Sequence, residues 1–169
     1  MKKPNRGERD WLFRYLEDHL LGATGGVRLF QAAAQTWKGT PYGRTLTRLQ
    51  DEISGERAEL LSSLKAQGHR PNPVKMAAAH FSAVVARVNP LNARKTEKGP
   101  GAQLELEALQ SLVRGKEALW VTLLALLDGG WSFPGYSHER LSQLAERARG
   151  QQQEIAAIMI ATAADRFRA

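Results

Sequence analysis

Polar side chains with acid–base or metal-binding chemistry interrupt the apolar stripes of this chain. His19, Glu56 and Gln151 each stand at helical spacing among apolar residues, and Lys116 and Glu117 are the nearest candidates on a further segment. A carboxylate beside an imidazole can fix one tautomer of the ring and form an acid–base pair. Buried groups of this kind need hydrogen-bond partners. The sequence therefore predicts a buried polar layer of His19, Glu56, Lys116 and Gln151.

This polar layer has two interpretations. It can fix the register of the helices, as a single buried polar residue does in a coiled coil. It can also line a small pocket in the core, where its groups would orient a polar ligand. The sequence leaves both interpretations open, and replacement of Glu56 by leucine would separate them through its effect on stability.

The chain lacks the ligand pattern of the metal sites that are usual in helical bundles. A carboxylate-bridged pair of metal ions needs a glutamate from each of two helices and a Glu-x-x-His pair from each of the other two. No glutamate of this chain has a histidine three positions later, and the chain has no cysteine. We therefore predict no bound metal and no cofactor. The alternative is an irregular site of His19, Glu56 and Glu59, which would make the protein a degenerate metalloprotein with oxidase or iron-handling activity.

Other catalytic motifs are missing as well. The chain has no Gly-x-Ser-x-Gly motif and no phosphate-binding loop. Gly22, Gly25 and Gly26 fall within a helical pattern, as do Gly55 and Gly115. We interpret these glycines as sites of close helix packing. The sequence therefore does not indicate an enzyme.

The elements that would position these residues are helices. Apolar residues recur at spacings of three and four, and good capping residues, Asn5 with Glu8 and later Ser137, precede two of the segments. The pattern predicts helices over about 6–37, 41–67, 74–88, 103–128 and 138–166. Short turns after Trp37 and after Asp128 favour antiparallel neighbours. We expect one all-α domain over residues 1–169, with two antiparallel helical hairpins joined by a long crossover that contains a short helix.

Helix order and the short–long–short connections resemble the ferritin-like superfamily over nearly the whole chain. Local runs also resemble a group of small bacterial proteins of unassigned function: residues 15–23 (Tyr-Leu-Glu-Asp-His-Leu-Leu-Gly-Ala), 40–43 (Thr-Pro-Tyr-Gly), 106–109 (Leu-Glu-Ala-Leu) and Gly115-Lys116. The first resemblance implies a ferritin-like four-helix bundle, in which the second and third long helices can run parallel. The second resemblance brings no known activity with it.

Most of the net charge of +7 falls in the crossover and its flanks. The predicted basic surface consists of Arg70, Lys75, Arg87, Arg94, Lys95 and Lys98. Such a surface can attract an anionic partner, either a phosphate backbone or a lipid headgroup. Nucleic acid is not favoured, because Phe81 is the only aromatic residue available for stacking there. The alternative is a solvated loop whose charges aid solubility.

The sequence thus predicts a non-catalytic binding or interaction protein. A homodimer formed through the basic surface, or through exposed Trp11, Trp37 and Trp131, is a further hypothesis. The longest runs without charge are shorter than the roughly 20 apolar residues that span a bilayer. The polar start of the chain does not fit a signal peptide. We expect a soluble, cytoplasmic protein.

Overall fold

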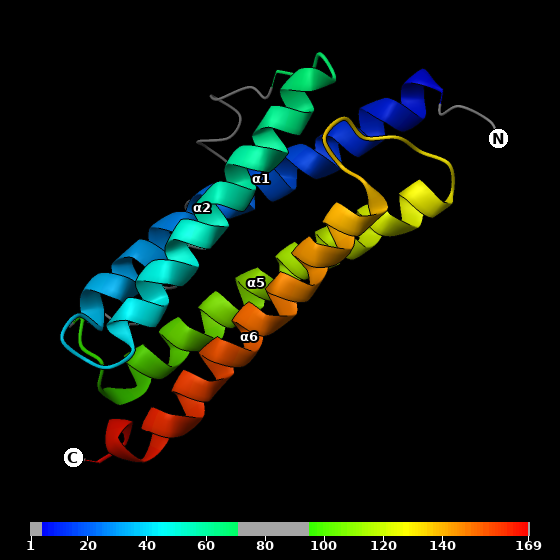
Figure 1. Cartoon of the computed structure of the whole chain (residues 1–169). Helices are drawn as coiled ribbons and strands as arrows, with labels where there is room; N and C mark the ends of the chain where they lie inside the picture. Colours follow the sequence, from blue (N-terminus) through cyan, green and yellow to red (C-terminus); the bar gives the residue numbers. More distant parts are fainter. Residues whose placement is uncertain (1–4, 71–94, 169) are drawn as a thin grey trace.

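The computed structural model describes residues 5–70 and 95–168, and these residues form four α-helices without a strand element (Figure 1). The helices are α1 (Arg6–Thr36), α2 (Gly43–Ala66), α5 (Gly99–Asp128) and α6 (His138–Arg166). The predicted all-α bundle of four long helices is confirmed. The short helix predicted over 74–88 lies outside the described residues.

The four helices form two hairpins that lie side by side. Figure 1 shows α1 antiparallel to α2, α5 antiparallel to α6, and α2 running in the same direction as α5. Side-chain contacts agree with this arrangement. Ser63 Oγ, near the end of α2, donates a hydrogen bond of 2.8 Å to the carbonyl oxygen of Pro134, in the turn after α5. At the opposite end, the guanidinium of Arg166 lies 6.0 Å from the ring centre of Trp37, which joins the last turns of α6 and α1.

Local chemistry explains where α1 and α6 begin. Asn5 and Glu8 form a capping box: the Glu8 N–H donates to Asn5 Oδ1 at 2.9 Å, and the Asn5 N–H donates to Glu8 Oε2 at 2.6 Å. Ser137 Oγ accepts from the Arg140 N–H at 3.1 Å. In both cases a side chain satisfies a backbone donor that the helix itself cannot.

Two predicted helix starts differ from the structure. Residues 40–42 form a turn instead of the first turn of α2, because Thr40 Oγ1 donates to the Trp37 carbonyl at 2.8 Å and the Gly43 N–H donates to the Thr40 carbonyl at 3.3 Å. The helix predicted to start near residue 103 begins at Gly99. Pro100 lies in its first turn, where the missing N–H of proline costs nothing.

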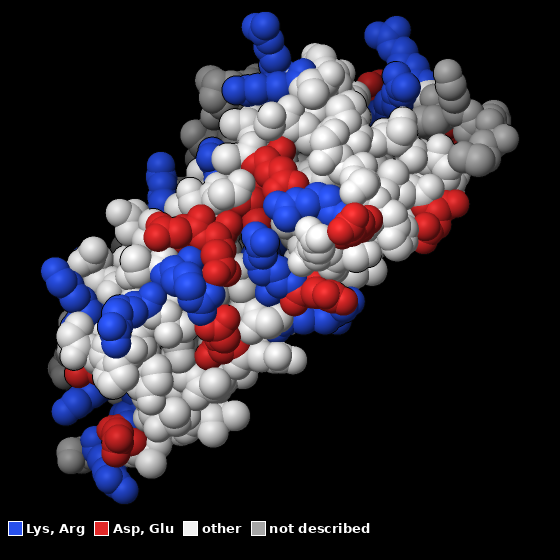
Figure 2. Space-filling model, in the orientation of Figure 1, with Lys and Arg blue, Asp and Glu red and all other residues white. Residues whose placement is uncertain are grey.

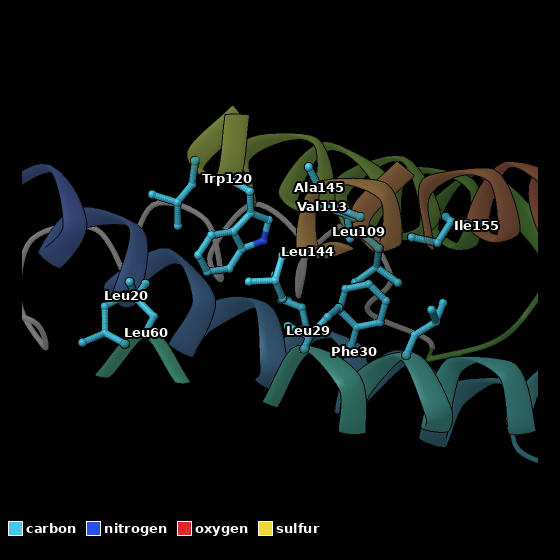
Figure 3. Packing of buried hydrophobic residues seen from close by; sticks show 14 of the residues in the cluster. Leu20, Leu29, Phe30, Leu60, Leu109, Val113, Trp120, Leu144, Ala145 and Ile155 are labelled. Carbon is cyan, nitrogen blue, oxygen red and sulfur yellow. The ribbon is translucent and has the colours of Figure 1, made fainter. Parts of the chain in front are cut away.

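The core lies between the hairpins (Figure 3). It is built from leucine, isoleucine, valine and aromatic side chains of all four helices, among them Leu20, Phe30, Leu60, Val113, Trp120 and Ile155. Their burial is the main favourable term for the fold, at about 1.5 to 3 kcal/mol for each large side chain. No helix of the described residues is long and apolar enough to cross a membrane.

Only some of the tryptophans that we expected to be exposed lie at the surface. Trp11 is 76% exposed and Trp131 is half-buried, whereas Trp37 is 1% exposed. The ring of Trp37 packs edge-on against Tyr42 at 6.1 Å, beneath Arg166. The prediction of an exposed Trp37 is therefore wrong, because the chain folds back at residue 37 and the C-terminal turn of α6 covers the ring.

Candidate functional site

A buried polar cluster joins α2, α5 and α6. The Lys116 ammonium on α5 donates hydrogen bonds to the Glu56 carboxylate on α2 and to Gln151 Oε1 on α6. The Gln151 amide nitrogen then donates to Glu52 Oε2 at 2.8 Å. We call Glu52, Glu56, Lys116 and Gln151 the polar cluster. The structure thus brings together three of the four residues of the predicted polar layer.

Burial acts against both charges of the central ion pair. It lowers the pKa of Lys116 and raises the pKa of Glu56, while the attraction between the two groups opposes each shift. Arg147 NH1 lies 3.8 Å from Glu56 Oε1, too far for a hydrogen bond. Burial also opposes the ionisation of Glu52, but hydrogen bonds from Gln151 and Arg48 outweigh it and lower the pKa of that carboxyl. Within the cluster Lys116 compensates Glu56, and Arg48 on the surface side compensates Glu52.

A band of interleaved acidic and basic side chains continues the polar cluster to the surface between α2 and α6 (Figure 2). Arg48 bridges Glu52, at 2.6 Å, and Glu154. Arg140 clamps the Glu59 carboxylate with two hydrogen bonds, of 2.9 and 2.5 Å. These long side chains connect the two hairpins along this face.

The irregular metal site proposed from the sequence is not assembled in the described part of the chain. The Glu59 carboxylate is bound by Arg140, and the Glu56 carboxylate is bound by Lys116. Among the described residues, no three His, Asp or Glu side chains are grouped so that they could hold a metal ion. His19 packs edge-on against Tyr15 at 4.6 Å between ring centres, and burial lowers the pKa of its imidazole.

A pocket of about 420 Å³ lies between α1, α2 and α5. Its wall is mainly apolar and includes Phe30, Ile53, Leu60, Val113, Leu119 and Trp120. Polar residues enter the wall at a few points, and they include His19, Glu56 and Lys116. His19 therefore lines the same pocket as Glu56 and Lys116 of the polar cluster, although it is not hydrogen-bonded to them. The combination of an apolar wall and a few polar groups is typical of small-molecule sites.

Three glycines of facing helices line the pocket: Gly22 and Gly26 on α1, and Gly115 on α5. A Cβ atom added to any of them would meet no atom of the described residues within 4 Å. Their interpretation as close packing sites is therefore wrong, because no backbone of residues 5–70 or 95–168 approaches them. Gly55 has similar open space but does not line the pocket. The three pocket glycines instead widen the pocket.

Two buried polar atoms of the pocket residues lack a hydrogen-bond partner among the described residues. These atoms are the indole Nε1 of Trp120, a residue 1% exposed, and Oε1 of Glu56, a residue 2% exposed. Figure 3 shows the Trp120 ring extending from α5 into the space between the hairpins. A buried donor without a partner costs about 1 to 3 kcal/mol. Trp120 stands at helical spacing among the leucines of α5, and such spacing does not distinguish a filled core from a pocket wall.

The basic surface is only partly visible. Lys75, Arg87 and Arg94 lie outside the described residues. Arg70 follows the end of α2, whereas Lys95 and Lys98 precede α5, and these two positions lie at opposite ends of the bundle (Figure 1). The described members therefore do not form one continuous patch.

Comparisons of the chain with protein-family models, with curated proteins and with solved structures found no match. The site must therefore be interpreted from its own geometry.

A second buried carboxylate, Glu117 on α5, should make the stability of the fold depend on pH in the acidic range. Gln152 and Arg149 donate to it at 2.8 Å each, and Arg114 donates at 2.6 Å. These bonds, with Gln152 first, lower the pKa of Glu117. A carboxylate with a lowered pKa in the folded state stabilises the fold above its unfolded pKa of about 4.3, and this stabilisation is lost as the pH falls through the folded pKa.

We therefore expect wild type to be more stable than Glu117→Gln at pH 7, and this advantage to be lost as the pH falls below about 4.3 and through the lowered folded-state pKa. Urea denaturation of both proteins across this range measures the difference. An advantage that does not change with pH would show that the ionised carboxylate is not the stabilising form.

Proposed function

We propose that this protein is a non-catalytic binding protein whose ligand is a small, largely apolar molecule held in the pocket between α1, α2 and α5. The observation that carries the proposal is the open space at Gly26, a buried helix-interior glycine on the mainly apolar pocket wall. Glycine inside a helix costs about 1 kcal/mol relative to alanine. Since alanine would fit at this buried position, the packing of the described residues gives no reason for glycine there, whereas a ligand that needs the space does.

The hydrogen bonds support the structural interpretation of the polar layer. Lys116, Gln151 and Glu52 satisfy one another across three helices. Glu56 and Lys116 also line the pocket. The structural layer thus forms one side of the pocket.

The charges of the pocket wall favour a ligand without net charge. The pocket wall holds two acidic residues, Asp18 and Glu56, and two basic residues, Arg57 and Lys116, so their formal charges cancel. An ionic ligand would disturb this balance in a mostly apolar environment, where an unpaired charge is costly. A neutral molecule with one polar group, such as a carbonyl or hydroxyl, fits a wall that is mainly apolar with a few polar groups.

We also propose that the bundle is ferritin-like. The support is the parallel direction of α2 and α5, together with the long segment that must connect the two hairpins. Within such a fold, the Lys116 ammonium would neutralise carboxylates that a metal ion compensates in the di-metal members.

The test uses N-phenyl-1-naphthylamine, a neutral apolar dye that fluoresces more strongly when it leaves water. We expect saturable binding of one dye molecule per chain. At a dye concentration of 100 times Kd, the free energy of unfolding should rise by about 2.7 kcal/mol. Trp11→Ser and Ile160→Ser remove strongly exposed apolar side chains and serve as controls. Binding that these variants abolish, or that does not saturate, would contradict the proposal.

A further inference from the structure

Lys116 lies at the boundary between the apolar pocket and the polar cluster. Its side chain lines the apolar pocket, and its ammonium also belongs to the polar cluster. An ammonium group has three N–H donors. Among the described residues, Glu56 and Gln151 accept two of them. This amine is therefore fixed at a pocket wall, whereas a surface lysine samples many rotamers in water.

The neighbours of Lys116 supply what a reactive amine needs. Glu56 is in direct hydrogen-bond contact and can take a proton from the ammonium. Burial lowers the pKa of Lys116 and raises the pKa of Glu56, so both shifts make that transfer easier than it is in water. Desolvated lysines beside a proton acceptor are the usual amine nucleophiles of proteins.

We propose that Lys116 condenses with aldehydes or ketones that enter the pocket and holds them as an imine. The inference rests on the proposed function, since the carbonyl compound must first bind in this pocket. It narrows the ligand class from neutral apolar molecules to neutral apolar carbonyl compounds.

The step is balanced without an external reactant. The Lys116 ammonium gives one proton to the Glu56 carboxylate, and the amine lone pair forms a C–N bond while the carbonyl π electrons move to oxygen. Glu56 returns its proton to that oxygen. Nitrogen then loses a second proton to the hydroxyl group, which leaves as water while the C=N bond forms. Ammonium and carbonyl compound thus become a protonated imine and one water molecule.

Other groups of the pocket support this chemistry. Apolar side chains such as Phe30 and Leu119 form most of the pocket wall and would pack against the apolar part of the carbonyl compound.

The experiment treats the purified protein with 2-naphthaldehyde and sodium cyanoborohydride at pH 7, which reduces an imine to a stable secondary amine. Intact-mass measurement gives the number of adducts, and peptide mapping locates them. We expect one adduct per chain on Lys116, formed before any adduct on the exposed Lys38. Lys116→Arg should abolish this adduct, and Glu56→Gln should slow its formation by roughly a hundredfold. Lys38→Arg is the matched control and should change nothing.

The wild-type map decides the question even if a variant does not fold. Adducts spread over exposed lysines, with Lys116 unmodified while N-phenyl-1-naphthylamine still binds, would overturn the imine and leave the proposed function standing. If neither the dye nor the aldehyde binds in the pocket, both proposals fail.

Discussion

Replacing Lys116 with methionine should lower the free energy of unfolding by about 3 to 5 kcal/mol. The change leaves the Glu56 carboxylate, in a residue 2% exposed, without the ammonium that compensates it, and it removes the donor to Gln151 Oε1. A buried charge that has lost its partner is one of the most costly defects in a protein interior. Urea denaturation at pH 7 measures the loss.

A double variant separates the charge from the packing. In Glu56→Leu with Lys116→Met both charges are gone, and most of the lost stability should return, since apolar side chains often replace a buried ion pair without cost. Lys38→Met, at an exposed position, should change stability by less than about 0.5 kcal/mol. A loss of less than about 1 kcal/mol for Lys116→Met alone would show that water reaches the cluster and compensates the charge.

Alanine at the pocket glycines should make the protein more stable and a weaker binder at the same time. Gly26→Ala and Gly115→Ala each add a methyl group that meets no described atom within 4 Å. We expect each to raise the free energy of unfolding by about 0.5 to 1 kcal/mol through helix propensity. The same methyl group takes up room in the pocket, and one extra carbon in a fitted apolar site weakens binding by about tenfold or more. Thermal denaturation and dye titration measure the two effects.

Gly55→Ala is the matched control for these variants. Gly55 lies inside α2 with open space for a Cβ atom, but it does not line the pocket. It should give the same gain in stability with no change in dye affinity. An equal affinity loss in Gly55→Ala, or a loss of stability in Gly26→Ala, would contradict the role that we assign to the pocket glycines.

The helices could be predicted because their signals are local. Capping residues such as Asn5 and Ser137 and the spacing of apolar residues act within a few turns of one helix. Trp37 shows the limit of this reasoning. Whether its ring is exposed depends on where the last turn of α6 lies, and Arg166 comes from the far end of the chain.

The candidate site could be predicted in part for the same reason. Glu56 and Gln151 interrupt apolar stripes, which marks them as buried, and Lys116 is one of the nearest candidates on its helix. The structure brings the three together. Glu52 lies one helical turn before Glu56 and is partly exposed, so it does not interrupt an apolar stripe. It belongs to the cluster because the Gln151 amide donates a hydrogen bond to it. The pocket is one of two interpretations of the polar layer, and the sequence could not decide between them. A helix-interior glycine fits close packing and open space equally well, and only the position of neighbouring helices decides between them.

The most direct test of the binding proposal is a crystal structure of the protein with bound N-phenyl-1-naphthylamine. The proposal predicts electron density for one dye molecule between α1, α2 and α5, in contact with Trp120 and beside Gly26 and Gly115. Density only at exposed apolar side chains such as Trp11 or Ile160, with the pocket occupied by water, would contradict it.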